Sequence, residues 1–214
     1  MYSNQDRYKD LSELRARLRS GKHFRIRTLD RKSKITVVSP HGGRIEPGSS
    51  RLARVIAGDD LNFFDFQGLT RFFPRPVDLH VTSTRFRDEI LDRLLAQSLT
   101  AVSIHGMGTE GKGQIWIGGL NQEAKSLVAA SLVGLGFAVD CDSPKYRGRS
   151  PNNFVNFPPQ KGLQLELSDD VMRSLFAPHD RLFDRRLEQG QQGSQASNIL
   201  MSKFAHAVRL AVGA

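Results

Sequence analysis

Cysteine is nearly absent from this 214-residue sequence, in which Cys141 is the single example. One cysteine excludes an internal disulfide and any metal site made of several thiolates. Long apolar runs are also absent, because no stretch approaches the roughly 18 consecutive apolar residues that span a bilayer. The first residues, MYSNQDR, lack the apolar core of a secretory signal. These absences predict a cytoplasmic protein that does not cross a membrane.

Acidic side chains are scarce relative to basic ones, with 22 Asp and Glu against 31 Lys and Arg and a formal net charge of +9. The excess lies at one end, because residues 1–54 hold 14 basic and five acidic side chains, and the remainder is neutral. Arginine outnumbers lysine by 22 to 9, and its planar guanidinium suits bidentate contacts with carboxylates or phosphates. The composition favours a polyanionic partner, which could be nucleic acid, a membrane surface or an acidic polymer.

The order of apolar patterns predicts an α/β fold, a single layered domain over residues 1–214 in which a mixed β-sheet is flanked by helices. Strands are expected at residues 24–29, 34–39, 61–66, 77–82, 101–104, 114–117, 137–139 and 162–167. Helices are expected at 11–18, between Pro47 and Gly58, at 88–98 and 122–135, and after a cap at Ser168 or Asp169. We expect a mixed sheet because residues 61–82 carry two successive strands with no helix between them.

Three segments within this domain differ from the central body. Residues 1–22 are expected to hold a basic N-terminal helix with leucines on one face. Residues 189–196 are rich in Gln and Gly and predict a flexible connector. The amphipathic pattern that follows predicts a C-terminal helix at 197–213.

Polar side chains of catalytic type lie at the ends of three predicted strands. His41 and Glu46 follow the strand at 34–39 in a loop that begins His-Gly-Gly, His105 follows the strand at 101–104, and Glu166 shares a face of the strand at 162–167 with Gln164. Ligands gather at the carboxyl ends of strands in α/β sheets, so these side chains could converge. Two histidines and one carboxylate, with a fourth position for water, form a ligand set of catalytic zinc. A further carboxylate beside such an ion can act as a general base.

The residues alone leave a structural interpretation open. A single histidine at a strand end is more often solvated or hydrogen-bonded within the protein, and paired glycines are common in turns. Glu166 could be an ordinary solvent-facing residue of its strand. Loose spacing of His and Glu is also far less specific than the pattern of a zinc ribbon.

Six stretches, in order, resemble the phage-type poly-γ-glutamate hydrolase family. They are residues 38–49 (VSPHGGRIEPGS), 63–69 (FFDFQGL), 78–86 (DLHVTSTRF), 102–106 (VSIHG), 117–120 (IGGL) and 162–168 (GLQLELS). The resemblance runs from about residue 7 to 176. It implies a zinc-carboxypeptidase-like fold, Zn²⁺ as cofactor, zinc ligands at His41, Glu46 and His105, and a general base at Glu166. The implied reaction is hydrolysis of γ-glutamyl amide bonds in poly-γ-glutamate or a related acidic peptide polymer.

Poly-γ-glutamate carries an α-carboxylate on every residue, so its hydrolase needs a groove that accepts anions. Arg44, Arg85 and Arg149 are candidates for binding these carboxylates. His80 and Asn153 are further expected substrate contacts, although His80 could instead orient a metal ligand. Members of the family are often carried by phages and prophages. Cell lysis would therefore release an enzyme that lacks a secretory signal.

One position departs from the family pattern. The family often has an arginine shortly after Gly-x-Ser-Pro-x-Asn, and this chain has Phe157 there. If that arginine binds a substrate carboxylate, the role is vacant or has moved, for example to Arg149. The departure affects the expected substrate more than the expected mechanism.

Two other functions remain possible at this point. The basic N-terminal region suits a nucleic-acid-binding protein, although no helix-turn-helix, zinc-finger or RNP signature accompanies it. The same ligand set could also serve a metal amidohydrolase of small N-acyl amino acids. We expect the basic end to attract a carboxylate-rich polymer toward a neutral catalytic body, and we expect no membrane partner.

Overall fold

The computed structural model describes residues 6–176 and 195–214. In this part of the chain, seven strands form one sheet in the order β1-β3-β2-β4-β7-β5-β6. The strands are β1 (Phe24–Leu29), β2 (Ile35–Gly43), β3 (Asn62–Gly68), β4 (Thr100–Gly106), β5 (Gln114–Gly119), β6 (Ala138–Asp140) and β7 (Gly162–Leu167). The sheet is mixed, as predicted. β3, β2, β4 and β7 are parallel neighbours, while β1 is antiparallel to β3 and β5 is antiparallel to β7.

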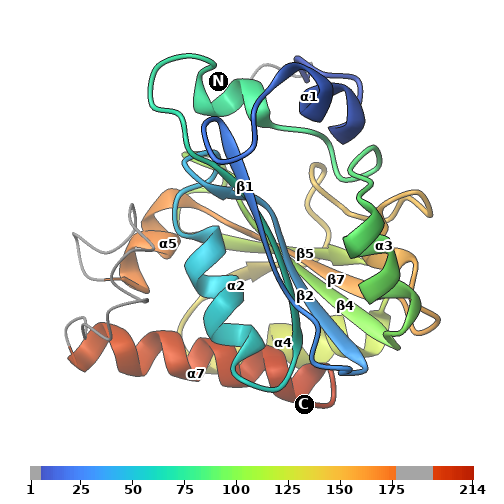
Figure 1. Ribbon diagram of the computed structural model, residues 1–214. Helices are drawn as coiled ribbons and strands as arrows, with labels where there is room; N and C mark the ends of the chain where they lie inside the picture. The colour runs from blue at the N-terminus through green and yellow to red at the C-terminus, as the bar shows by residue number, and fades with distance from the viewer. Residues whose placement is uncertain (1–5, 177–194) are drawn as a thin grey trace.

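Helices cover both faces of this sheet (Figure 1). They are α1 (Leu11–Arg17), α2 (Ser49–Ala57), α3 (Glu89–Ala96), α4 (Gln122–Gly134), α5 (Asp169–Ser174) and α7 (Gln195–Ala211), with 3₁₀ turns η1 (Pro76–Leu79) and η2 (Phe154–Asn156). α2, α4, α5 and α7 pack on one face. α1, α3 and both 3₁₀ turns pack on the other. None of the described helices has both the length and the apolar character needed to cross a bilayer.

Two apolar cores result, one on each face. Even-numbered residues of β4 and odd-numbered residues of β7 face the first core, whose fully buried members include Val102, Leu163 and Leu165. The second core contains Phe64, Phe66 and Phe86. Each side chain of this kind stabilises the fold by about 1.5–3 kcal/mol when buried. Strand alternation places the even-numbered residues of β7 on the second face, where the polar site described below lies.

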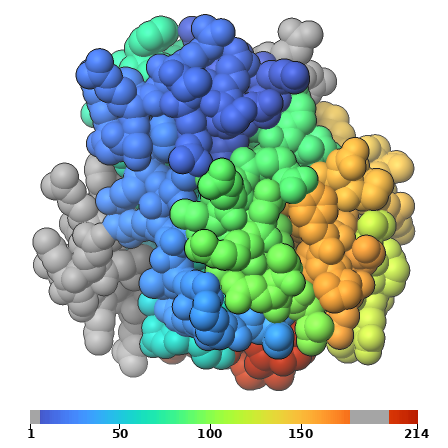
Figure 2. All heavy atoms as spheres, turned by 45° about the vertical axis from the view of Figure 1, so that its right-hand side comes forward, coloured from blue at the N-terminus to red at the C-terminus, as the bar shows by residue number. Residues whose placement is uncertain are grey.

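Capping side chains set the start of several helices close to the predicted positions. Asp10 Oδ1 accepts a hydrogen bond from the backbone N–H of Glu13 at 2.9 Å, and Asp88 caps α3 in the same way. Arg15 of α1 also pairs with Asp88 at 2.7 Å. Figure 2 shows the result, with the N-terminal residues (blue) covering the top of the molecule next to the green α3 region.

The prediction of a strand at residues 77–82 is wrong. Pro76 opens the 3₁₀ turn η1, and the Asp78 carboxylate accepts the backbone N–H of Arg75 at 2.8 Å, which caps the turn. Leu79 and Val81 are buried in the second core. The alternation of apolar and polar residues therefore reflects a segment that lies across the face of the sheet. The antiparallel pairs that make the sheet mixed are formed by β1 and β5 instead.

The terminal helices lie near their predicted positions. α1 falls within residues 1–22, and α7 begins and ends two residues before the predicted 197–213. Residues 189–194 of the predicted connector lie outside the described residues.

Candidate active site

Three neighbouring parallel strands bring the predicted catalytic residues together. His41 lies near the end of β2, His105 in the penultimate position of β4, and Glu166 in the same position of β7. His105 and Glu166 are register partners across the β4–β7 pair. The expected convergence at the carboxyl ends of the strands therefore occurs. His41 and His105 lie inside their strands rather than after them, and Glu166 lies within its strand as predicted.

The loop from His41 to Glu46 turns back because two glycines allow a close backbone approach. A β-carbon on Gly43, whose φ is +66°, would lie 2.5 Å from the carbonyl oxygen of Gly68. One on Gly42 would lie 2.2 Å from Asp65 Oδ1. The backbone N–H of Glu46 donates to the carbonyl of His41 at 2.9 Å and closes the turn. The sequence His-Gly-Gly thus returns Glu46 to the histidine that precedes it.

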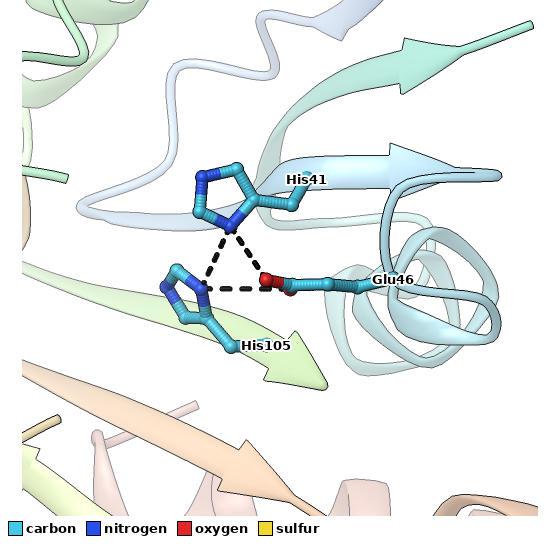
Figure 3. A group of neighbouring side chains, drawn as sticks. All are labelled: His41, Glu46 and His105. Carbon is cyan, nitrogen blue, oxygen red and sulfur yellow. Dashed lines mark hydrogen bonds and ion pairs between the residues drawn. The ribbon is translucent and has the colours of Figure 1, made fainter. Parts of the chain in front are cut away.

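His41, Glu46 and His105 form a compact buried cluster (Figure 3). His41 Nδ1 lies 2.8 Å from Glu46 Oε1 and 3.2 Å from His105 Nδ1. His105 Nδ1 lies 3.6 Å from Glu46 Oε2. The backbone N–H of Gly106 donates to Glu46 Oε2 at 2.9 Å and fixes the carboxylate. One nitrogen from each histidine and one carboxylate thus point at a common centre.

His41 presents a lone pair to this centre. Its Nε2 lies 2.9 Å from the carbonyl oxygen of Val81 and must donate to it, so the proton of the neutral ring is on Nε2. Burial lowers the pKa of His41 to about 4, and the opposing attraction of Glu46 does not compensate. At neutral pH the Nδ1 lone pair therefore faces an anionic oxygen at 2.8 Å. A cation between these atoms would relieve the repulsion.

The cluster fits a divalent metal ion. His41, Glu46 and His105 each offer one ligand atom, and these atoms lie within 4.8 Å of one another. A tetrahedral ion with bonds of 2.0–2.1 Å holds its ligand atoms about 3.3 Å apart, close to the observed separations. The Val81 carbonyl supplies the outer hydrogen bond that commonly orients a ligating histidine. Two imidazoles and one carboxylate are donors that suit zinc.

Glu166 lies at the edge of this cluster, with its Oε1 3.9 Å from His105 Nδ1. Burial raises the pKa of Glu166 to about 7; His105 opposes this effect and the nearby Glu46 anion adds to it. The pKa of His105 is lowered by burial, but the attraction of Glu166 and Glu46 outweighs burial and raises it overall. A carboxyl that titrates near neutrality can both accept and release a proton.

A directed chain of amide hydrogen bonds holds Glu166. The backbone N–H of Val155 donates to Asn153 Oδ1 at 3.1 Å, and Asn153 Nδ2 donates to Gln164 Oε1 at 2.7 Å. Gln164 Nε2 then donates to Glu166 Oε1 at 2.8 Å and to the carbonyl of Tyr146 at 3.2 Å. Because the first donor is a backbone N–H, each amide has one orientation, and Glu166 Oε1 must act as an acceptor. We call this the Asn153–Gln164 relay.

The cluster and Glu166 line a cavity of about 460 Å³. Of the expected substrate contacts, His80, Arg149 and Asn153 also line it. Arg44 and Arg85 do not, and the guanidinium of Arg85 binds Asp6 at 2.5 Å instead. The buried Asn153 is occupied by the relay. Asn153 therefore holds Glu166 through Gln164, and its expected role as a substrate contact stays a prediction.

Asp6 is a residue that the sequence analysis missed. Its carboxylate accepts hydrogen bonds from His80 Nδ1 at 2.7 Å and from the backbone N–H of Thr82 at 2.8 Å. Burial raises the pKa of Asp6, but these hydrogen bonds outweigh burial and lower it to about 2. The Asp6 anion holds the His80 ring, whose centroid lies 4.0 Å from that of His41. No sequence motif connects the two residues, because they are 74 positions apart.

The loop after β6 supplies three further cavity residues that the sequence did not indicate, Tyr146, Arg147 and Gly148. Tyr146 has a positive φ of 53° and stacks on Trp116, with ring centroids 5.9 Å apart. Burial and a hydrogen bond to Glu110, another cavity residue, raise the pKa of the Tyr146 hydroxyl. In the sequence, a Tyr-Arg pair followed by glycine in a segment without a helix or strand pattern could have indicated these cavity residues.

Phe157 stands beside a cation supplied from elsewhere in the chain. The guanidinium carbon of Arg87 lies 4.6 Å from the centroid of the Phe157 ring. Arg87 also pairs with Asp92 at 3.0 Å. A positive charge therefore remains close to the position at which the family often has arginine, although its carrier lies on the segment before α3.

Comparison with known proteins gives consistent results. The family described as poly-γ-glutamate hydrolase matches residues 8–207. The chain is 32% identical over 175 residues to YoqZ, an SPbeta prophage-derived protein of Bacillus subtilis (strain 168). This match covers 80% of the present chain and 62% of YoqZ, so the chain spans less than two thirds of that relative's length.

Two solved structures share the fold. The structure of a bacteriophage poly-γ-glutamate hydrolase has a TM-score of 0.83 and 28% identity, over 97% of this chain and 96% of that one. A structure of YndL described as the apo, zinc-free form has a TM-score of 0.81 and 24% identity, over 98% of each chain. The matches confirm the zinc-carboxypeptidase-like fold that the sequence resemblance implies.

Proposed function

Because the chain belongs to the poly-γ-glutamate hydrolase family, we propose that it hydrolyses γ-glutamyl amide bonds of poly-γ-glutamate or a closely related acidic polymer. The observation that carries the proposal is the buried cluster of His41, Glu46 and His105 with Glu166 beside it in one cavity. This function is favoured by the family match over nucleic-acid binding and over hydrolysis of small N-acyl amino acids.

We infer that His41, Glu46 and His105 would hold a zinc ion. Bound there, zinc would lower the pKa of a water molecule and polarise the scissile carbonyl. The description of the YndL structure as zinc-free is consistent with zinc in this fold. His41 is suited to the role because its Nε2–H is fixed on the Val81 carbonyl, which leaves Nδ1 for the ion.

Glu166 is the proposed general base. It would accept a proton from the attacking water and later deliver that proton to the departing amide nitrogen. A pKa of about 7 suits both transfers. The Gln164 hydrogen bond to Oε1 leaves Oε2 as the oxygen that exchanges the proton.

The cavity also carries cations for the substrate. Arg147 and Arg149 line it, and both side chains are exposed. Arg149 also pairs with the exposed Asp142 at 3.0 Å, so a substrate α-carboxylate would compete with or add to that contact. His80, oriented by Asp6, is a third candidate. We propose these residues, rather than Arg44 or Arg85, as the contacts nearest the scissile bond.

The test is digestion of purified poly-γ-glutamate, with product sizing and measurement of bound zinc. We expect shortened polymer, about one zinc per chain, and loss of cleavage in Glu166→Gln with zinc retained. Cleavage by Glu166→Gln at the wild-type rate would overturn the role of Glu166. Cleavage of small N-acyl amino acids but not polymer would favour the amidohydrolase alternative.

A further inference from the structure

Two exposed aromatic side chains stand outside the cavity on the segment between β3 and η1. We call residues 70–75 (TRFFPR) the Phe72–Phe73 loop. Phe72 is 79% exposed and Phe73 is 75% exposed, the highest values among the exposed large apolar side chains of the described residues. Adjacent phenyl rings left in water are a common sign of a binding surface.

The loop is stiff rather than free. Thr70 Oγ1 donates to the carbonyl of Pro74 at 2.7 Å and closes the loop. Pro74 and Pro76 fix their own φ angles and restrict the residues before them. The rings are thus presented at a low entropy cost to whatever binds them.

Arginines accompany both rings. The guanidinium carbon of Arg71 lies 5.4 Å from the Phe72 centroid, and that of Arg7 lies 5.5 Å from the Phe73 centroid. Arg71 makes no ion pair with any other residue that the structure describes. Arg7 and Arg75 share the single carboxylate of Asp78, at 3.4 and 2.9 Å. The surface therefore combines apolar faces with an excess of positive charge.

The loop is attached directly to the wall of the cavity. The backbone N–H of Arg75 binds Asp78 and anchors the loop on η1, whose Val77 lines the cavity. In Figure 1 the segment lies at the top of the molecule, close to the described start of the chain. Val77 lies four positions after Phe73, so the Cα atoms of the two residues are at most about 14 Å apart. A γ-linked glutamate adds five backbone bonds, about 6 Å when extended.

We propose that the Phe72–Phe73 loop and Arg7 form a second binding site for the polymer, two to three residues from the scissile bond. Its arginines pair with α-carboxylates, and its phenyl rings pack on the methylene groups between them. This inference rests on the proposed function and names a feature of the substrate, a chain long enough to reach the loop. Short γ-glutamyl oligomers fill only the cavity.

The experiment compares the full-length protein with a triple variant, Arg71→Ala with Phe72→Ala and Phe73→Ala. A matched control is Leu127→Ala with Val133→Ala, which removes two exposed apolar side chains from α4 on the opposite face of the sheet. Each is measured on long poly-γ-glutamate and on γ-linked diglutamate. Binding of end-labelled long polymer is measured separately in a Glu166→Gln background, where chain cleavage does not interfere.

We expect the triple variant to raise KM for long polymer by about tenfold, with a change of less than twofold for diglutamate. Affinity in the Glu166→Gln background should fall by a similar factor, and the control pair should match the wild type. Equal effects on long and short substrates, or unchanged polymer affinity, would overturn the second site. Two other results with unchanged polymer affinity would also overturn the second site. In the first, the wild type is a dimer and the triple variant is a monomer. In the second, the wild type binds anionic vesicles and the triple variant does not. The binding measurement decides the matter even if the wild type cleaves neither substrate, a result that would refute only the proposed function.

Discussion

Replacing Asn153 by aspartate should reverse the direction of the hydrogen bonds in the Asn153–Gln164 relay, with almost no change in side-chain volume. Asparagine accepts from the Val155 backbone and donates to Gln164 Oε1 at 2.7 Å. An aspartate can still accept from Val155 but has no proton to donate. Its second oxygen would face Gln164 Oε1, and the repulsion between two acceptors would turn the Gln164 amide over.

The turned amide presents its oxygen to Glu166 Oε1, which accepts from Gln164 at 2.8 Å in the wild type. Glu166 then loses a hydrogen bond to its charged form, a contribution of about 1.5–3 kcal/mol. Since 1.36 kcal/mol corresponds to a tenfold change in rate, kcat should fall roughly 10- to 100-fold. KM should change little, because the cavity cations are untouched.

The assay is steady-state hydrolysis of poly-γ-glutamate, with thermal unfolding measured alongside. Asn62→Asp is the matched control, since Asn62 is also fully buried and donates to the backbone carbonyl of Ser33 at 2.8 Å, at the other end of the sheet. We expect both variants to lose stability and only Asn153→Asp to lose kcat. Gln164→Met removes the relay entirely, so adding Asn153→Asp to it should cost nothing more.

Wild-type kcat in Asn153→Asp would show that Glu166 does not depend on the relay. Equal losses of kcat in the two aspartate variants would show that the effect follows general destabilisation. Fully additive losses in the double variant would mean that Asn153 acts by a route other than Gln164.

Three further predictions concern the metal cluster, the N-terminal contact and the loop after β2. Zinc at about 100 times its Kd should stabilise the wild type by about 2.7 kcal/mol in thermal unfolding, and His41→Ala should abolish this gain. Asp6→Asn should lower the free energy of unfolding by about 2 kcal/mol at pH 7, because folding lowers the pKa of Asp6 from 3.8 to about 2. In urea unfolding, the difference in stability between wild type and variant should shrink as the pH falls from 4 to 2. A difference that stays constant over this range would refute the assignment. Gly43→Ala should reduce both stability and zinc affinity, measured by calorimetry, because its β-carbon would meet the Gly68 carbonyl at a positive φ.

Much of the fold could be predicted because local patterns and tertiary structure agree. β1 and β7 have the predicted bounds, and α3 begins after the Asp88 cap. The segment 77–82 failed because apolar alternation reports burial on one side only. It does not distinguish a strand paired within a sheet from a segment lying across its face, and Pro76 was the available warning.

The cluster of His41, Glu46 and His105 could be predicted because strand ends converge by topology and because the family resemblance singled out these three residues. The residues that support the cluster could not be predicted. Gln164 was used only to show which face of the strand Glu166 shares. Asn153 takes its place in the relay as the N-cap of the 3₁₀ turn η2, which no sequence pattern predicted. Arg85 was expected to bind substrate because its charge suits a carboxylate. The carboxylate it binds is Asp6, 79 positions away in the chain.

The net charge of +9 does not by itself describe the surface that a polymer would meet. Several basic residues of the N-terminal region have structural partners; Arg15 binds Asp88, Arg25 binds Gln67, and Arg31 donates to the Leu61 carbonyl. The arginines that line the cavity, Arg147 and Arg149, belong to the part of the sequence whose charges balance. Screening confines exposed charges to about 10 Å at moderate salt, so attraction of a polymer depends on which cations surround the cavity. Arg71 and Arg7, beside the exposed rings, should therefore contribute more to polymer binding than the net charge of the whole chain does. Raising the salt concentration should weaken binding of long polymer in the wild type more than in the triple variant.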